Sequence, residues 1–301
     1  MQHQMASLSV DTLPDLPSKA ESNTIVSTKR RVSALSDSFM IESQEVTLTG
    51  EIWLLRHGQT PWAMSGQHTG RSDVKLTDEG VAQAIDAGRR LTEDRDGRKF
   101  ELVMSSPLSR AHDTAVLASK GLVGGDGKIH KTDGLLEWDY GAAEGRTRDE
   151  IAELVRSANA THAGWTESTL DGETVPYQPE AAGSSATTWD LWTDGPQVLP
   201  EAMRGDETMM VDGHEVAVRR GDGETLAGLR ARVKTVLKEI QPTLDAGGDV
   251  LLVAHSHVLR ELTVAWLGLP AAAGRHFELG TAKYAVLGDH KGDHVVRGWG
   301  L

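Results

Sequence analysis

Two histidines follow the two most apolar strand-like runs of this chain. His57 lies in Arg56-His57-Gly58-Gln59-Thr60 after the run 52–55, and His255 lies in Ala254-His255-Ser256-His257 after the run 250–253. In an open α/β sheet, ligands bind at the carboxyl ends of the strands. Histidines delivered there, one of them beside an arginine and a glycine, predict a site for nucleophilic chemistry on an anion.

Phosphoryl transfer without a metal fits this set of residues. It needs a nucleophile, cations that hold the non-bridging oxygens, and an acid that protonates the leaving oxygen. His57 is the candidate nucleophile, and the guanidinium of Arg56 can bind a phosphate through two hydrogen bonds. Gly58 lets the main chain come close to an anionic ligand. Arg-His-Gly alone is weak support, because this tripeptide occurs by chance in many chains.

Further charged candidates follow the second predicted strand. The segment 105–111 predicts a helix with Pro107 at its first position and Arg110 in its first turn, where the helix dipole disfavours a cation unless an anion lies beside it. Downstream, Glu137 and Asp139 share one face of an extended segment, so their spacing leaves either as the proton donor. An exposed surface arginine and two solvated loop acids are the alternative interpretation.

A metal site is the rival interpretation of the second histidine segment. His255 and His257 share one face if the strand continues through them. No suitably spaced third ligand accompanies them, so we expect neither a bound metal nor a cofactor.

Strand and helix patterns alternate around these residues. Such alternation predicts a three-layer α/β sandwich, in which a mostly parallel sheet has helices on both faces. Strands are expected at 51–56, 100–105, 128–132, 249–254, 284–287 and 295–299, and helices at 76–93, 107–120, 147–158, 224–245 and 258–267. The helix at 147 begins with a capping box, Thr147 to Glu150.

Two segments do not share this alternation. Residues 1–46 are rich in Ser and Thr and lack a sustained period, which predicts a disordered N-terminal tail before a catalytic domain at 47–301. Residues 159–223 show no clear elements and carry 12 acidic and 3 basic residues, most of the net charge of −13. A stretch of this length inside a domain is uncommon, so we expect a partly ordered acidic insertion near the mouth of the site.

The composition of the chain limits where the protein can act and what it can bind. The chain of 301 residues has no cysteine and no apolar run long enough to span a bilayer. It has no basic stripe of the kind that binds nucleic acid. We therefore expect a cytoplasmic protein with no nucleic acid or membrane partner. The phosphate chemistry predicted for His57 and Arg56 makes a small phosphorylated metabolite the expected partner. An oligomer is compatible with the sequence but not indicated by it.

Taken together, the motifs resemble the histidine phosphatase superfamily, which has the phosphoglycerate mutase-like fold. Arg56-His57-Gly58, Ser106-Pro107 with Arg110, Glu137 with Tyr140-Gly141, and His255 occur in the order and approximate spacing of that family, over roughly residues 50–290. The resemblance implies that His57 becomes phosphorylated and that Arg56, Arg110 and His255 bind the phosphoryl group. It also implies that Glu137, rather than Asp139, is the general acid.

Within the superfamily, several stretches are most similar to the sedoheptulose-1,7-bisphosphatase branch. They are residues 56–62, 65–70, 137–141, 189–195, 223–225 and 266–268. By this resemblance Thr69, Gly70 and Tyr140 line the substrate pocket, together with Gly58, Thr60 and Ser256 of the two histidine segments. Ser256 stands where the family commonly has glycine, and the interval from Trp192 to Gly223 is longer than in that branch.

The expected activity is therefore metal-independent hydrolysis of a sugar phosphate or bisphosphate, sedoheptulose 1,7-bisphosphate being one candidate, through a phosphohistidine. Phosphoglycerate mutase-type phosphoryl transfer and broad-specificity acid phosphatase activity are the alternatives. A non-catalytic binding protein on the same fold is a third. The intact set of His57, Arg56, Arg110, Glu137 and His255 argues against the third.

Overall fold

The computed structural model describes residues 50–161, 167–170, 173–176 and 189–301, within a compact unit that spans Glu45–Leu301. The predicted tail at 1–46 lies outside the described residues. Among those residues no helix is long and apolar enough to cross a membrane. The strands are β1 Ile52–Arg56, β2 Leu102–Ser105, β3 Ile129–Lys131, β4 Glu167–Leu170, β5 Glu173–Pro176, β6 Gly205–Val211, β7 His214–Arg220, β8 Val250–Ala254, β9 Tyr284–His290 and β10 Asp293–Trp299. The helices are α1 Pro61–Ser65, α2 Asp78–Asp94, α3 Ser109–Ala118, α4 Arg148–Thr161, α5 Leu191–Asp194, α6 Leu226–Asp245 and α7 Ser256–Trp266.

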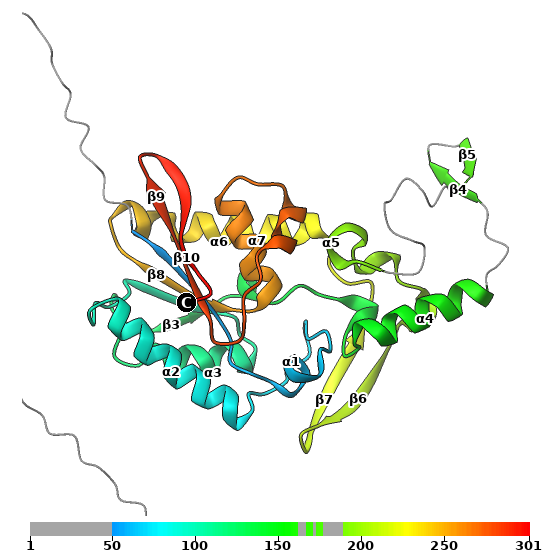
Figure 1. The fold of residues 1–301 in the computed structure, drawn as a ribbon, viewed down its shortest axis with the longest axis horizontal. Helices are drawn as coiled ribbons and strands as arrows, with labels where there is room; N and C mark the ends of the chain where they lie inside the picture. Colours follow the sequence, from blue (N-terminus) through cyan, green and yellow to red (C-terminus); the bar gives the residue numbers. More distant parts are fainter. Residues whose placement is uncertain (1–49, 162–166, 171–172, 177–188) are drawn as a thin grey trace, which may run out of the picture. The chain divides into compact units, whose positions relative to one another are not determined.

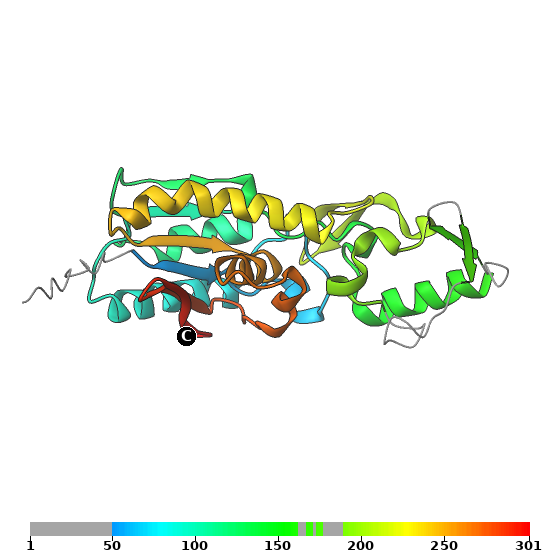
Figure 2. The same ribbon diagram turned by 90° about the horizontal axis from the view of Figure 1, so that it is seen from above.

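A six-stranded sheet in the order β10-β9-β1-β8-β2-β3 forms the centre of the unit. Four neighbouring strands, β1, β8, β2 and β3, are mutually parallel, and β9 pairs with β1 in the antiparallel direction. Figure 2 shows β1 and β8 pointing the same way, so the segments that follow them leave the sheet at the same edge. The predicted three-layer α/β fold with a mostly parallel sheet is confirmed.

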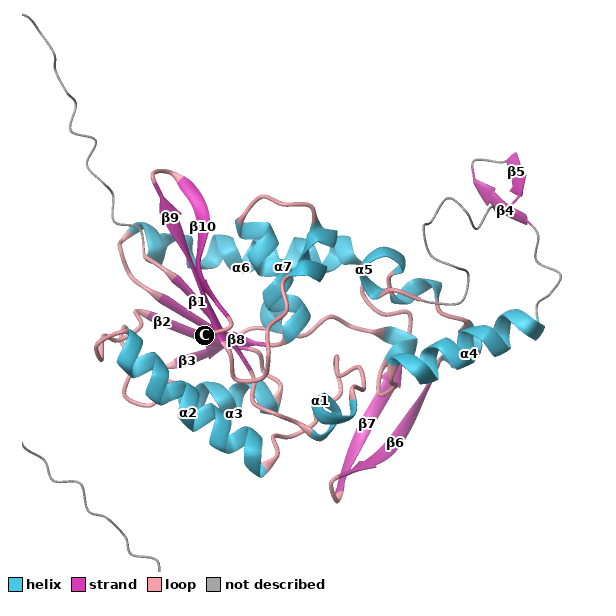
Figure 3. Cartoon of the chain, in the orientation of Figure 1, coloured by secondary structure: helices cyan, strands magenta, loops and turns pink. Residues whose placement is uncertain are grey.

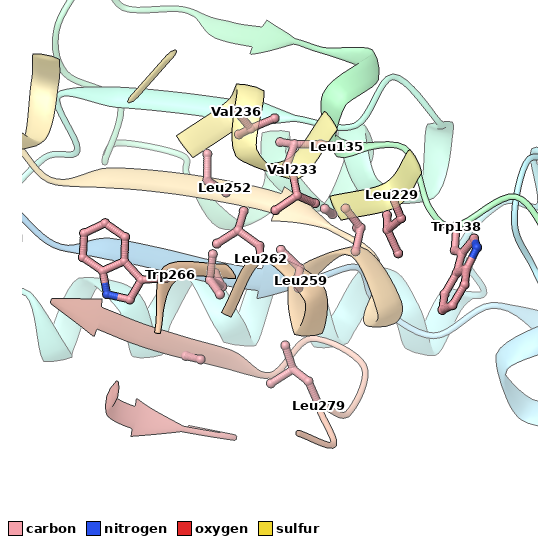
Figure 4. Close-up of a cluster of buried hydrophobic side chains, with 14 of the residues drawn as sticks. Leu135, Trp138, Leu229, Val233, Val236, Leu252, Leu259, Leu262, Trp266 and Leu279 are labelled. Carbon is pink, nitrogen blue, oxygen red and sulfur yellow. The ribbon is translucent and has the colours of Figure 1, made fainter. Parts of the chain in front are cut away.

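Helices cover both faces of this sheet, because its strands alternate their apolar side chains. Ile52 and Leu54 of β1 face α6 and α7, whereas Trp53 and Leu55 face α2 and α3. Figure 1 shows the two helix pairs on opposite sides of the strands. The larger cluster, drawn in Figure 4, joins Leu252 of β8 to side chains of α6 and α7 and continues to Trp138 beside the site.

Two helix starts show how local bonds set the boundaries. The capping box of α4 is present: the Glu150 carboxylate accepts from the main-chain N–H of Thr147 at 2.8 Å, and the Thr147 hydroxyl accepts from Glu150 N at 3.3 Å. The predicted start at Pro107 is wrong. Helix α3 begins at Ser109, because the carboxylate of Asp73 accepts from Ser109 N at 2.8 Å and caps the helix there. Arg110 still lies in the first turn.

The interval 159–223 contains elements that the sequence pattern did not indicate. Strands β6 and β7 form an antiparallel hairpin, visible in Figure 3 as a pair of long strands. Its turn residues Asp212 and Gly213 both have positive φ, at 49° and 76°. The hairpin packs Val216 and Val218 against Trp62 of α1. Helix α5, also in this interval, contributes to the pocket described next.

Candidate active site

A pocket of about 510 Å³ lies at the carboxyl ends of β1 and β8. His57 directly follows β1, and Ser256 and His257 belong to the first turn of α7 after β8. Residues 189–192, in and before α5, form part of the wall. The lining residues used below are Arg56, His57, Gln67, His68, Thr69, Glu137, Tyr140, Arg148, Trp189, Asp190, Trp192, Ser256, His257, Arg260 and Arg275.

His57 is held in one tautomer. Its ring Nδ1 lies 2.7 Å from the carbonyl oxygen of Gly58. A carbonyl only accepts, so Nδ1 carries the hydrogen and Nε2 keeps its lone pair. Burial, followed by the positive charges of Arg110 and Arg56, holds the pKa of His57 well below 6.5. The neutral imidazole therefore presents Nε2 as a nucleophile.

Arg56 lies beside this histidine in the pocket wall. Its Nη1 donates to the carbonyl of Leu279 at 2.7 Å, which fixes the guanidinium. Its Nε is buried without a hydrogen-bond partner among the described residues. A buried donor without a partner is costly, so an anionic ligand at this point would repay the cost.

Arg110 and His255 lie together in the interior, and neither lines the pocket. Arg110 Nε donates to Nδ1 of His255 at 3.1 Å, while its two Nη atoms donate to the carbonyls of Thr69, Gly70 and Ser72. Since Nδ1 of His255 accepts, its Nε2 carries the hydrogen and donates to Ser106 Oγ at 2.8 Å. The His255 ring lies 5.2 Å from the His57 ring, centroid to centroid.

Glu137, and not Asp139, reaches the pocket. Its Oε1 accepts from the main-chain N–H of Trp138 and Val258, both at 2.9 Å, and its Oε2 from His257 N at 3.0 Å. Burial raises the pKa of Glu137, but the interactions with His257 and His255 outweigh it and hold that pKa well below 4.5. Asp139 instead accepts from Gly141 N. Of the two carboxylates, Glu137 lines the pocket and Asp139 does not.

The second histidine segment also differs from the expectation of a continued strand. Strand β8 ends at Ala254, and His255 is the N-cap of α7, so His255 and His257 do not share a face. His257 turns instead to Tyr140, whose hydroxyl lies 2.6 Å from its Nδ1. Within the described parts of the chain, no group of three or more His, Cys, Asp or Glu side chains is arranged to hold a metal ion.

The predicted substrate-binding residues divide into two groups. Thr69, Tyr140 and Ser256 line the pocket. Gly58, Thr60 and Gly70 do not. A Cβ on Gly58 would meet the carbonyl oxygen of Gly80 at 2.2 Å, so glycine serves a close main-chain contact there.

The other two residues outside the pocket stabilise the loops around it. Thr60 is wholly buried, and its hydroxyl caps α1 by accepting from Ala63 N at 3.1 Å. Gly70 N donates to the buried carboxylate of Glu144 at 2.9 Å. This bond fixes the loop whose carbonyls bind Arg110.

Sequence reasoning did not assign several residues that line the pocket. His68, Trp189 and Trp192 lie in stretches singled out only for their resemblance to the family. Arg148, Arg260 and Arg275 come from α4, α7 and the turn after it, and no motif gave them a role in the site, although Arg148 lies within the capping box of α4. Their only signal was positive charge on elements that begin or end near the carboxyl edge of the sheet.

Similarity to known proteins agrees with this architecture. The sequence model of the histidine phosphatase superfamily, branch 1, matches residues 52–177 and 196–301. An acid phosphatase of Mycobacterium tuberculosis is 30% identical over 250 residues, which cover 82% of this chain and 91% of the relative. The sedoheptulose 1,7-bisphosphatase of Saccharomyces cerevisiae is 28% identical over 229 residues, 74% of this chain and 69% of the relative. The solved structure of an open reading frame product of Mycobacterium tuberculosis has a TM-score of 0.58 and 29% identity, covering 84% of this chain and 97% of that one.

The mostly parallel α/β sheet carries a buried histidine at its carboxyl edge, in a pocket that an arginine and a carboxylate also line. The chain belongs to the histidine phosphatase superfamily, branch 1. Its relatives include named phosphatases.

Proposed function

We propose that this protein is a metal-independent phosphatase that hydrolyses a sugar phosphate or bisphosphate through a phosphohistidine at His57. The observation that carries the proposal is the bond from His57 Nδ1 to the carbonyl of Gly58, because it leaves Nε2 with a free lone pair in the pocket. Arg56 and Glu137, which line the same pocket, supply the cation and the acid that the reaction needs.

In the first step, His57 Nε2 attacks phosphorus in line with the leaving oxygen. The N–P bond forms as the P–O bond to the sugar breaks, and Glu137 gives its proton to the departing oxygen. Arg56 stabilises the charge on the non-bridging oxygens. Arg110 is buried behind His57 and adds positive charge at short range, and the resemblance predicts that it and His255 also contact the phosphoryl group. Such contact requires the phosphoryl oxygens to compete with the bonds that now engage both side chains.

Glu137 must acquire its proton from the encounter with substrate. In the free protein its pKa is held well below 4.5, so it is a carboxylate at neutral pH. A phosphate monoanion carries a proton, and its second pKa is about 6. Bringing that anion next to Glu137 raises the carboxyl pKa by like-charge repulsion and so shifts the proton toward the carboxylate. The reactive complex thus has one proton shared between the two groups.

In the second step, water replaces the sugar. Glu137, again a carboxylate after its proton has left with the alcohol, takes a proton from a water molecule that attacks phosphorus. The N–P bond to His57 breaks, and inorganic phosphate and neutral His57 are released. Glu137 thus serves as the acid in the first step and as the base in the second.

The remaining charges of the pocket support an anionic, phosphorylated substrate larger than phosphate itself. Arg148, Arg260 and Arg275 line the same pocket as His57, whereas the whole chain is acidic. Arg275 pairs with Asp190. Arg260 donates to the carbonyls of Gly274 and Arg275, at 2.8 Å each, and lies over the ring of Trp192, but it has no ion-pair partner among the described residues. A second phosphate on a sugar would meet this cation.

The test measures phosphate release in the presence of EDTA from sugar monophosphates and bisphosphates, 3-phosphoglycerate and p-nitrophenyl phosphate. We expect phosphate release that prefers a sugar phosphate or bisphosphate and that His57→Ala abolishes. We also expect an acid-labile phosphohistidine to be trapped in the wild type and not in the variant. Transfer of phosphate between positions with little release to water would instead establish a mutase. Activity lost in EDTA and restored by a divalent metal would refute the scheme.

A further inference from the structure

His68 is a firmly anchored residue of the pocket wall that the proposed reaction does not use. Its main-chain N–H and its ring Nδ1 both bond to the carbonyl of Arg146, at 2.9 Å and 2.8 Å. Its own carbonyl accepts from Gly145 N at 2.8 Å. The ring lies between Tyr140 and Trp189, at centroid distances of 5.2 Å and 5.6 Å. The imidazole therefore has one orientation.

The anchoring bond also fixes the chemical character of the ring. Because the carbonyl of Arg146 accepts, Nδ1 of His68 carries the hydrogen, and Nε2 of the neutral ring is an acceptor. Burial lowers the pKa of His68 to about 4, the nearby His257 and Arg148 adding to that effect against the Arg146 bond, so the ring is neutral in the physiological range. His68 lines the pocket and its Nδ1 is engaged by Arg146, so Nε2 is the ring nitrogen left for a ligand in the pocket.

Nε2 of His68 has no hydrogen-bond partner in the described part of the chain, and it is not sealed from solvent. Three other side-chain acceptors of the pocket, those of Glu137, Asp190 and Gln67, already have donors from the protein. Glu137 accepts from three main-chain N–H groups, Asp190 from the amides of α5, and Gln67 Oε1 from the hydroxyl of Ser65 at 2.6 Å. His68 thus offers an oriented, neutral acceptor in a wall otherwise rich in cationic donors.

We propose that His68 is a specificity-determining residue, whose Nε2 accepts a hydrogen bond from an alcohol hydroxyl of the substrate. A lone pair repels a phosphoryl oxyanion and attracts an O–H donor, so this residue faces the part of the substrate that carries no phosphate. The substrate class is then a phosphate ester of a polyhydroxylated compound. The inference rests on the proposed function and adds to it the residue that recognises the polyol.

The sharpest variant is His68→Asn. The Asn amide can still donate to the carbonyl of Arg146, as Nδ1 does, but it places no acceptor at the position of Nε2. The measurement is kcat/KM for the preferred sugar phosphate, for its set of monodeoxy analogues, and for p-nitrophenyl phosphate, which has no alcohol hydroxyl. His290→Asn, on the exposed part of β9, is the matched control.

We expect His68→Asn to lower kcat/KM for the sugar phosphate about tenfold relative to p-nitrophenyl phosphate, since one hydrogen bond is lost. For one monodeoxy analogue, the wild type and the variant should be equally slow, because the hydroxyl that His68 binds is already missing. An equal fall on every substrate, or no change on any, would overturn the assignment. Failure of the proposed function itself is distinguishable, because activity would then survive in His57→Ala.

Discussion

Replacing Glu137 by glutamine asks whether this carboxylate acts as an acid or only organises the pocket. The substitution keeps the size of the side chain but replaces one acceptor oxygen by an NH2 donor. In the wild type, Oε1 accepts from Trp138 N and Val258 N, and Oε2 accepts from His257 N at 3.0 Å. The Gln oxygen can satisfy only one of these two positions, so at least one main-chain N–H then faces another donor.

The structural cost of Glu137→Gln follows from that count. Leaving a buried N–H unsatisfied costs about 1–3 kcal/mol in the free energy of unfolding. Because the folded-state pKa of Glu137 is depressed, its carboxylate stabilises the fold above the unfolded pKa of 4.5, and this contribution is lost as pH falls through the lower folded-state pKa. Urea unfolding should therefore show a larger gap between wild type and variant at pH 7 than near pH 3.

The catalytic cost depends on the leaving group. General acid catalysis contributes about 10²- to 10⁴-fold, and a sugar alcohol needs that proton far more than the nitrophenolate ion does. The constant kcat/KM reports only steps through formation of the phosphohistidine, so it isolates the acid role from the later base role. We expect it to fall about 10²- to 10⁴-fold for a sugar phosphate and much less for p-nitrophenyl phosphate. Equal losses on both substrates, in a variant shown to be folded, would refute proton donation by Glu137.

Two further predictions concern pH. The constant kcat/KM should fall about tenfold per pH unit above the second pKa of the phosphate, about 6, because the reactive complex needs one proton shared with Glu137. Activity should persist well below pH 6.5, because the pKa of His57 is depressed. A value of kcat/KM that still rises at pH 8 would contradict this. Glu261, wholly buried beside Arg230, has a pKa raised by burial to about 7. The stability that comes from this raised pKa is fully present below pH 4.5 and is lost as pH rises through 7. In urea unfolding, the free energy of unfolding of Glu261→Gln should therefore rise by up to about 3 kcal/mol relative to wild type between pH 4 and pH 8. A difference that does not change with pH would show that the carboxyl does not titrate in this range.

The parts of the fold that sequence could predict are those whose signal is local. The continuous apolar runs of β1 and β8 predict buried parallel strands, and both strands lie next to each other at the centre of the sheet. The capping box at Thr147 is a four-residue pattern that stabilises its own helix without outside help. In each case the signal lies within a few consecutive residues, even though β1 pairs with a strand far along the chain.

The hairpin of β6 and β7 was missed although its turn signal was present. Asp212-Gly213 is a dipeptide typical of two-residue hairpin turns, since both positions need positive φ. The flanking alternation was hard to see because the buried positions of β7 include Arg220 beside Val216 and Val218. Arg220 is buried because it donates to the carbonyl of Glu144 and pairs with Glu207, partners that only the folded chain supplies.

Arg110 shows most clearly why the site could be located from sequence but not fully assigned. A cation in the first turn of a helix conflicts with the helix dipole unless an anion lies beside it, and this conflict marked Arg110 as a candidate for the site. The partners turned out to be the carbonyls of Thr69, Gly70 and Ser72 and the lone pair of His255, none of which is an anion. The carboxylates of Glu137, Glu144 and Asp73 act on Arg110, but its hydrogen-bond partners are neutral and the guanidinium keeps its positive charge. That charge is one reason why the pKa of His57 is low, so Arg110 helps to keep the nucleophile neutral even where it touches no ligand.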